Sequence, residues 1–166
     1  MKARNYREVK GAPYTRKKFI HGVPQPKIAK FSMGNPSGDY GYRISLISLE
    51  RAQIRHNALE AARVAANRYL EEKVGEKNYH LHVPLYPHIV LRENKMIFGA
   101  HADRLSDGMK KAFGKPIGTA SRVEPNQPVI VIELNQDAID VAKESLRRGA
   151  SKLPTKSRII IEKNMD

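Results

Sequence analysis

The sequence contains no cysteine and no tryptophan. Without cysteine there can be no disulfide and no thiolate metal site, and this usage is typical of an intracellular protein. Without tryptophan, any stacking on nucleic-acid bases falls to tyrosine, phenylalanine, histidine or arginine. No apolar run approaches the roughly 20 residues that span a bilayer, and the opening residues, MKARNYREVKG, lack the apolar core of a signal peptide. We therefore expect a soluble cytoplasmic protein with no membrane partner.

Acidic residues are scarce as well: 17 Asp and Glu stand against 30 Lys and Arg, which gives a formal net charge of +13. A charge excess of this size indicates an anionic partner, most often nucleic acid and less often a membrane surface. The excess is greatest in residues 1–30, where nine basic residues accompany one acid, Glu8. A segment with one sign of charge repels itself and stays extended until a partner neutralises it.

Residues 1–40 also contain four glycines and four prolines, which exclude a long helix. They predict an extended basic arm that follows the surface of a partner. Four aromatic side chains are interleaved with the basic ones: Tyr6, Tyr14, Phe19 and Phe31. These rings either stack on bases and sugars or hold the arm against its own domain, and the sequence leaves both alternatives open.

A first helix is predicted from Ser48, acting as its N-cap, to Lys73, with Gly75 just past its end. At 100° per residue its apolar side chains fall on one arc: Ile54, Ala58, Ala61, Ala62, Ala65, Ala66 and Tyr69. Because most of this arc is alanine, the helix must lie close to whatever it packs against, most simply a sheet.

Apolar and β-branched runs predict strands at 42–47, 79–86, 89–91, 128–134 and 158–162. A second helix is predicted over 136–148, between Asn135 as N-cap and Gly149 as terminator. Strand–helix–strand therefore occurs twice, which predicts an α+β fold: a two-layer sandwich of a sheet and two main helices. We expect two parts, a basic RNA-binding arm (1–40) and a single α+β domain (41–166) with a long functional loop (99–123).

This loop contains three glycines after Gly99 and four basic residues before Pro116, and it has no clear helical or strand period. Most connections in compact domains are only about 4–6 residues long, so an irregular segment of this length indicates function. The arm and the part of the loop before Pro116 together contain 13 of the 30 basic residues, whereas the first predicted helix is close to neutral. Extensions rich in glycine, proline and charge suit RNA, which is recognised largely through its shape and phosphates.

Three chemical alternatives fit the sequence less well. His80, His82 and His88 are close in sequence, but their spacing is not specific for a metal. The run Gly108–Pro116 departs from a phosphate-binding P-loop, because five residues separate its glycines instead of four and Pro116 replaces the required Ser or Thr. An acid–base site can be drawn from residues of the loop: His101, Asp103, Ser106 and Asp107. We expect no cofactor, no metal and no enzymatic activity.

Three stretches resemble one known family in the right order: ADRLSDGMKKAFGKPIG (102–118), YTRKKFIHGVPQPKI (14–28) and NALEAARVAANRYL (57–70). The family is the large-subunit ribosomal protein called L-sixteen in bacteria and L-ten-e in archaea and eukaryotes, here in its archaeal form. The resemblance covers essentially the whole chain.

The resemblance implies a structural ribosome component, bound to ribosomal RNA near the aminoacyl-tRNA site, whose loop faces tRNA and the peptidyl-transferase centre. It implies ribosomal RNA contacts for seven arm residues: Arg4, Arg7, Tyr14, Arg16, Lys17, Lys18 and Lys27. It places seven residues in the tRNA-facing loop: Arg104, Met109, Lys110, Lys111, Phe113, Gly114 and Lys115. The implied partners are large-subunit ribosomal RNA, tRNA and neighbouring ribosomal proteins, with no homo-oligomer.

Two rival functions remain at this point. The same scaffold could act as a free RNA chaperone or ribosome-assembly factor, which would sediment apart from the large subunit. An RNA-processing or phosphate-transferring enzyme would instead use His101, Asp103 and Asp107, and would lose turnover when they are replaced.

Overall fold

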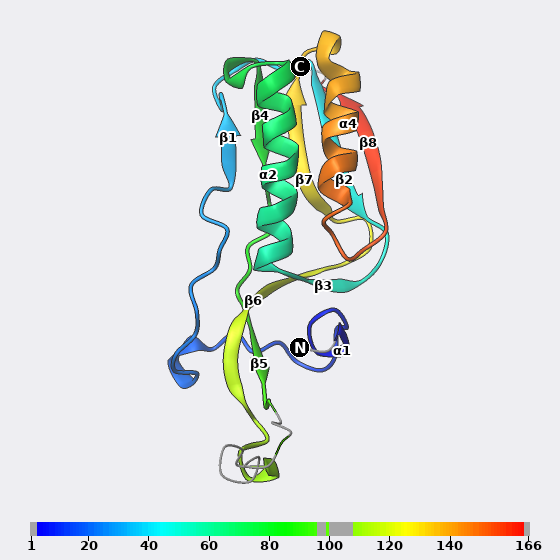
Figure 1. Ribbon diagram of the computed structural model, residues 1–166. Coiled ribbons are helices and arrows are strands. Elements are labelled where there is room, and N and C mark those ends of the chain that lie inside the picture. Colours follow the sequence, from blue (N-terminus) through cyan, green and yellow to red (C-terminus); the bar gives the residue numbers. More distant parts are fainter. Residues whose placement is uncertain (1–2, 96–98, 100–107, 165–166) are drawn as a thin grey trace.

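The computed structural model describes residues 3–95, 99 and 108–164, and at Arg4, Asn5 and Lys111 it describes the backbone. Within these residues, two sheets and two main helices form an elongated molecule (Figure 1). The larger sheet has five strands in the order β1-β4-β7-β2-β8, and the smaller has three in the order β3-β6-β5. The predicted α+β fold with two main helices is confirmed.

All paired strands are antiparallel. The larger sheet consists of β1 (Ser32–Gly34), β2 (Tyr42–Ser48), β4 (Tyr79–His82), β7 (Pro128–Leu134) and β8 (Ser157–Lys163). The smaller sheet consists of β3 (Ala52–Arg55), β5 (Ile89–Glu93) and β6 (Lys115–Val123). The α-helices are α1 (Ala3–Tyr6), α2 (His56–Lys73) and α4 (Ile139–Ala150). Short 3₁₀ helices are η1 (Lys17–Phe19), η2 (Glu76–Asn78), η3 (Gly108–Lys111) and η4 (Gln136–Ala138).

Each main helix connects two parallel strands that have another strand between them. α2 leads from β2, through β3, to β4, and both β2 and β4 are antiparallel to β7. α4 leads from β7 to β8, and both of these strands are antiparallel to β2. The two units interlock in the order β4-β7-β2-β8, which is the ferredoxin-like β-α-β-β-α-β arrangement. Both helices cover the same face of the larger sheet (Figure 1), and β5 and β6 extend beyond it.

The hydrophobic core lies between the larger sheet and the two helices. Ile44 of β2 stands opposite Ile132 of β7, and both side chains are fully buried. The largest fully buried side chain is Tyr79, whose hydroxyl donates to Asn67 Oδ1 on α2 at 2.8 Å. Burial, with the nearby Glu71 and Glu76, raises the pKa of Tyr79 to about 12, so its hydroxyl stays protonated and keeps donating this hydrogen bond.

The predicted strands at 42–47, 128–134 and 158–162 are confirmed as β2, β7 and β8, to within one residue at each end. The prediction for 79–86 is too long, because β4 ends at His82 before Pro84. Past that end the backbone N–H of Val83 donates to the Phe31 carbonyl in the arm at 2.8 Å. Proline cannot donate in a ladder, which explains why the strand ends there.

The predicted start of the first long helix is wrong. α2 begins at His56, and residues 52–55 form β3, which pairs with β6. Ser48 caps no helix; its hydroxyl donates to the Glu50 carbonyl at 2.8 Å in the turn between β2 and β3. Serine makes such local turns as readily as it makes caps, and long-range pairing with β6 decides between them. The predicted end is confirmed, because Gly75 follows the helix with a φ of +82°.

The predicted buried arc of this helix is rotated from the real one. Leu59 and Leu70 are fully buried together with Ala62 and Ala66, whereas Ala61 is exposed. The predicted arc starts at Ile54, which lies in β3 and not in the helix. The predicted buried side of the helix is therefore turned away from the real one. The alanines do permit a close approach, as predicted, but the approach is to α4 as well as to the sheet.

Gly149 lies inside α4 and does not terminate it. A Cβ at this position would meet the Ala62 carbonyl oxygen at 3.4 Å and the Ala66 Cβ at 3.6 Å, so the two helices touch there almost backbone to backbone. Asn135 is likewise no side-chain cap, because its Oδ1 accepts from the Gly41 backbone N–H at 3.4 Å and η4 precedes α4. Gly149 and Asn135 therefore make contacts between distant segments and do not form the predicted helix ends.

His56 joins the arm, α2 and the smaller sheet. Its side chain is 5% exposed, and its Nδ1 accepts a hydrogen bond from the Lys27 backbone N–H at 2.9 Å. A Cβ on Gly118 of β6 would lie 3.2 Å from its Nε2, so the imidazole rests against a glycine of that strand. Burial lowers the pKa of His56, and the charges of Arg55 and Lys27 lower it further, which favours the neutral ring that can accept this hydrogen bond.

The fold is expected to lose stability through His56 as the pH falls. The pKa of His56 in the fold is below its usual value of 6.5, so the unfolded chain binds more protons. This stabilisation is complete above the pKa of His56 in the unfolded chain. It declines as the pH falls from that value to the lower pKa of His56 in the fold. Urea unfolding between about pH 8 and pH 5 should show a smaller decline in His56→Gln than in the unchanged chain. The exposed-site control His88→Gln should keep the full decline, and equal declines in all three chains would contradict this role.

Candidate nucleic-acid interface

The arm runs along its own domain in an extended path. The backbone N–H of Gln53 on β3 donates to the Arg7 carbonyl, and that of Val90 on β5 donates to the Tyr14 carbonyl, each at 2.8 Å. Farther along, Ile28 is buried in the core and β1 pairs with β4. Between the short turns α1 and η1 the arm is extended, and its own domain holds it at several points.

Arg122 of β6 holds the arm where it passes the smaller sheet. Its Nη1 donates to the Gly11 carbonyl at 3.0 Å, and its Nη2 donates to the Lys10 carbonyl at 3.3 Å. Its Nε donates to Gln53 Oε1 at 3.1 Å. Because all three nitrogens donate within the chain, using three of the five N–H groups, Arg122 positions the arm.

Arg92 of β5 ties the arm to the end of the loop. Its guanidinium contacts two rings, 4.2 Å from the Tyr14 centroid and 4.0 Å from the Phe113 centroid. It donates to the Tyr14 hydroxyl at 2.7 Å and to the Phe113 carbonyl, and the two rings meet edge to face at 5.6 Å. A planar guanidinium can stack and donate at once, which a lysine cannot do. We name Tyr14, Arg92 and Phe113 the arm–loop cluster.

The loop predicted over 99–123 is irregular only in part. Residues 115–123 form β6, the central strand of the smaller sheet, paired with β5 on one side and β3 on the other. The prediction is wrong there because buried positions of β6 are occupied by polar Thr119 and Ser121, which conceal the strand period. Residues 100–107 lie outside the described residues, and with them Arg104 and the proposed acid–base group of His101, Asp103, Ser106 and Asp107.

The described end of the loop presents exposed side chains. Met109 is 79% exposed and Phe113 is 50% exposed, and the lysines at 110 and 115 are also exposed. Gly114 has a φ of +73°, and a Cβ on it would collide with the backbone of Glu93. This glycine therefore permits both the left-handed turn and the close approach at the base of the β5–β6 hairpin. At Lys111 the backbone lies in η3.

The basic residues of the arm differ in what surrounds them. Arg16, Lys17 and Lys18 are exposed around η1, and among the described residues no carboxylate lies within ion-pair distance of them. Phe19 beside them is 70% exposed. Arg7 in contrast lies 3.7 Å from Glu50. The group at 16–18 is thus the most available cationic patch of the arm.

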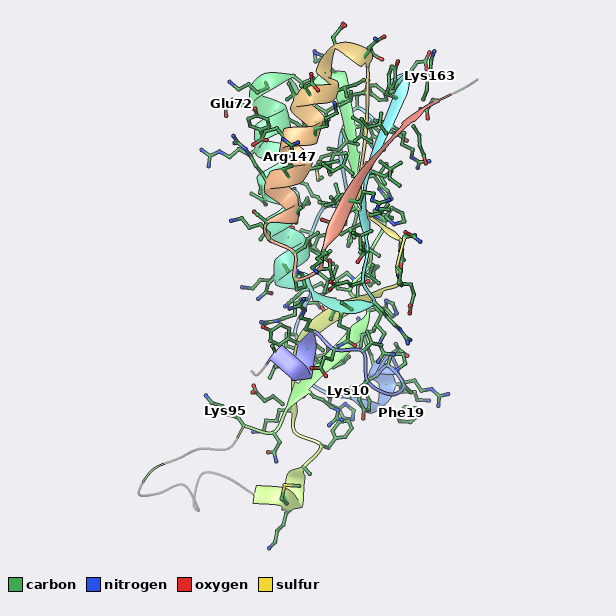
Figure 2. All side chains as sticks on the ribbon, turned by 90° about the vertical axis from the view of Figure 1, so that its right-hand side faces the viewer. Lys10, Phe19, Glu72, Lys95, Arg147 and Lys163 are labelled. Carbon is green, nitrogen blue, oxygen red and sulfur yellow. The ribbon has the colours of Figure 1, made fainter. Side chains whose placement is uncertain are left out.

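Lys27 and Arg4 are also among the residues predicted to contact ribosomal RNA. Lys27 is exposed, and its backbone N–H is the donor to His56. Arg4 lies in α1, where the structure describes its backbone. Figure 2 shows Lys10, Phe19 and Lys95 at one end of the molecule, opposite to Glu72 and Lys163. The first half of the arm and the base of the loop therefore share one end.

The four aromatic side chains of the arm differ in whether they hold the arm against its own domain or stay available for stacking. Tyr14 belongs to the arm–loop cluster, and the Phe31 ring lies 5.5 Å from the Tyr86 ring, so both hold the arm against its domain. The Tyr6 ring lies 5.2 Å from the Arg55 guanidinium. The Phe19 ring has Lys18 Nζ 6.0 Å from its centroid but is 70% exposed, and it stays available for stacking.

The histidines of β4 serve the larger sheet. His80 Nε2 lies 2.8 Å from Ser32 Oγ on β1, and its Nδ1 lies 3.0 Å from Glu133 Oε2 on β7. The His82 ring stacks beside it at 6.3 Å. In the described part of the chain, no three side chains of the metal-binding types come together as a possible metal site. The same residues include no helix long and apolar enough to cross a bilayer.

The sequence predicted the arm and the loop but not the two arginines that connect them. Arg92 lies 78 residues from Tyr14 and 21 from Phe113, and Arg122 lies 111 residues from Gly11. A local pattern cannot report contacts over such separations. The sequence offers one signal for these two arginines, which is that each is a charged residue within a strand-like segment.

The fold and this surface define a class: a basic α+β protein that presents an extended arm, lysines and exposed rings to a large anionic partner. Comparison with known proteins agrees. A family model described as ribosomal protein L16p/L10e matches residues 9–160.

Three similar proteins each carry the name large ribosomal subunit protein uL16. The protein of Staphylothermus marinus is 58% identical over 160 residues, covering 96% of this chain and 92% of the relative. The protein of Hyperthermus butylicus is 61% identical over 149 residues, covering 90% and 83%. The protein of Sulfolobus acidocaldarius is 52% identical over 160 residues, covering 95% and 91%.

The chain therefore belongs to the L16p/L10e family of ribosomal proteins, in its archaeal form. It is a structural, RNA-binding component of the ribosome in the cytoplasm and not an enzyme.

Proposed function

We propose that this structural constituent of the large ribosomal subunit binds ribosomal RNA near the aminoacyl-tRNA site and helps to position tRNA. One observation carries the proposal: the arm–loop cluster brings the cationic arm and the base of the loop to the same end of the molecule. Docking the arm on RNA would then fix where the loop points. Neighbouring ribosomal proteins are further partners of this assembly.

The chemistry of this function is electrostatic and steric. Exposed Arg16, Lys17 and Lys18 would neutralise phosphates, and Phe19 would stack on a base or sugar. Arg7 and Tyr14, which have partners within the chain, would contribute to RNA binding mainly through the position they give the arm. At the loop, Met109, Lys110, Lys111 and Lys115 would face tRNA together with Arg104.

The lysines at 110 and 111 are expected to support tRNA binding and not folding. Lys110 is exposed in η3, a short turn outside the core. Replacing both by alanine should leave the Tm within about 1 °C, since surface changes of this kind cost little stability. In reconstituted large subunits the same change should weaken tRNA binding about tenfold, because two cations near phosphates are lost. Calorimetry and tRNA filter binding measure the two effects.

A matched control replaces Lys73 and Lys77, which lie near the end of α2, by alanine. It removes the same charge at the opposite end and should leave tRNA binding unchanged. A large fall in Tm for the 110/111 variant would show that these lysines support the fold. Recovery of the unchanged protein away from large subunits after a high-salt sucrose cushion would contradict the proposal and favour a free RNA chaperone or assembly factor.

A further inference from the structure

A pocket of about 260 Å³ lies where four segments meet, away from the arm–loop cluster. Its lining includes Tyr6 of the arm, Arg55 at the end of β3, Asn57 in the first turn of α2, and Lys152 and Pro154 in the turn between α4 and β8. A pocket of this size holds at most one nucleotide, whose phosphate stays at the rim, and excludes a duplex.

The charge of this pocket has one sign. Arg55 and Lys152 are its charged lining residues, and no carboxylate lines it. Three other surface pockets of the described residues each include at least one glutamate, drawn from Glu8, Glu50, Glu72 and Glu93. A concave site with two cations and no acid favours an anionic ligand.

Asn57 leaves a hydrogen-bond acceptor unused beside this pocket. Its Oδ1 is buried and has no donor among the described residues. A buried polar atom without a partner costs stability, and native proteins rarely contain one without a reason. The neighbouring Gln53 contrasts with it, because its Nε2 donates to the Tyr6 carbonyl at 3.2 Å and its Oε1 accepts from Arg122. A small rotation of the Asn57 side chain would turn this oxygen toward the pocket, where a ligand that carries an N–H or O–H group can supply the missing donor.

The third feature of the pocket is a cation–π contact. The Arg55 guanidinium lies 5.2 Å from the centroid of the Tyr6 ring, and both side chains are partly exposed. Tyrosine rings and guanidinium planes are the surfaces on which unpaired RNA bases stack. The pocket therefore combines a stacking surface, a hydrogen-bond acceptor and two cations.

We propose that this pocket binds one unpaired nucleotide of RNA, with its phosphate at Arg55 and Lys152, its base against Tyr6, and a base amine or ribose hydroxyl donating to Asn57 Oδ1. The proposal rests on the proposed function, which supplies RNA as the partner, and it adds a site that uses none of the seven arm residues for which the family resemblance implies ribosomal RNA contacts. A bare anion would leave Tyr6 and Asn57 without a role, and an acidic peptide would leave Tyr6 without a flat partner.

Crosslinking in intact large subunits that contain this chain tests the proposal directly. Irradiation at 254 nm joins bases to the side chains they touch, and mass spectrometry then identifies the modified peptides. We expect nucleotide adducts on the peptide with Tyr6 or on the peptide with Lys152. Adducts on the arm peptide with Phe19 but on neither of these would overturn the pocket and leave the proposed function standing. Joining of these two peptides to another protein would also overturn it.

Two variants test the chemistry in the free full-length chain, with binding of a fluorescent single-stranded RNA 12-mer as the readout. Asn57→Leu should weaken binding about fivefold to tenfold, since one hydrogen bond is lost, while the Tm stays equal or rises because an unpaired buried acceptor is removed. Unchanged affinity, or a lower Tm, would contradict the role of Asn57. Joint replacement of Arg55 and Lys152 by glutamine should weaken binding at least tenfold.

The matched control replaces Lys77 and Lys163 by glutamine, which removes the same charge at sites outside the pocket. Equal loss in both double variants would show that only overall charge matters and would overturn the pocket. Titration with AMP and UMP separates RNA from a free nucleotide: mononucleotide binding as tight as that of the 12-mer would also overturn the proposal. If the unchanged chain bound no RNA and did not sediment with the large subunit, the proposed function itself would fail.

Discussion

A chain in which Arg16, Lys17 and Lys18 are all replaced by glutamine is expected to bind large-subunit RNA about 100- to 1,000-fold more weakly at low salt. These side chains are exposed around η1, with no described carboxylate at ion-pair distance, so their charge is available to phosphates. Each phosphate contact that is lost removes the counterion release which favours binding. Filter binding at several KCl concentrations should show the slope of log K against log salt fall by about 3.

The stability of the free chain should hardly change in this variant, because these exposed side chains make little contact: Lys18 Nζ lies 6.0 Å from the Phe19 ring centroid, a weak cation–π contact. The matched control replaces Lys77, Lys156 and Lys163, which are equally exposed but lie outside the arm. It lowers the net charge by the same amount and should weaken binding only slightly. Similar losses in the two triple variants would mean that the arm acts only through net charge, contrary to the proposed docking.

The sequence predicts those elements whose local pattern and tertiary environment agree. β7 consists of the run PVIVIEL, which is buried along most of its length, and α4 places Ala142 and Leu146 on the side that meets the core. β2 and β8 have the same kind of signal. Their boundaries follow from the residues within them, which is why they are found nearly correctly.

The wrong predictions share one physical cause, which is that distant pairing overrides a local signal. Ser48 has the sequence context of an N-cap, but residues 52–55 pair with β6 and delay the helix to His56. β6 is missed because its buried polar residues give no apolar period. Gly149 looks like a helix end and instead lets α4 approach α2.

The candidate site is predictable in part for the same reason. Charge and composition identify the arm and the loop, because both signals are local. Arg92 and Arg122 act between segments far apart in sequence, and their contacts are knowable only from the fold. The fold also separates the available cations at 16–18 from Arg7, which has Glu50 beside it.

Replacing Gly114 by alanine is expected to displace the loop and to reduce tRNA binding by reconstituted large subunits at least tenfold. Gly114 has a φ of +73°, which costs an alanine about 1–2 kcal/mol, and its Cβ would also collide with the Glu93 backbone. That collision lies at the end of the β5–β6 ladder, where Glu93 pairs with Lys115. Hydrogen exchange at this pair should rise markedly, while the core and its Tm change little.

The chain itself offers a matched control for this experiment. Gly22 has a φ of +72°, almost the value at Gly114, but a Cβ there would meet nothing within 4 Å. Gly22→Ala therefore carries the same backbone strain without the collision, and it should retain tRNA binding and the slow exchange of the β5–β6 ladder. If the two variants behaved alike, backbone strain would explain the whole effect. The close approach of Gly114 to Glu93 would then have no part in placing the loop.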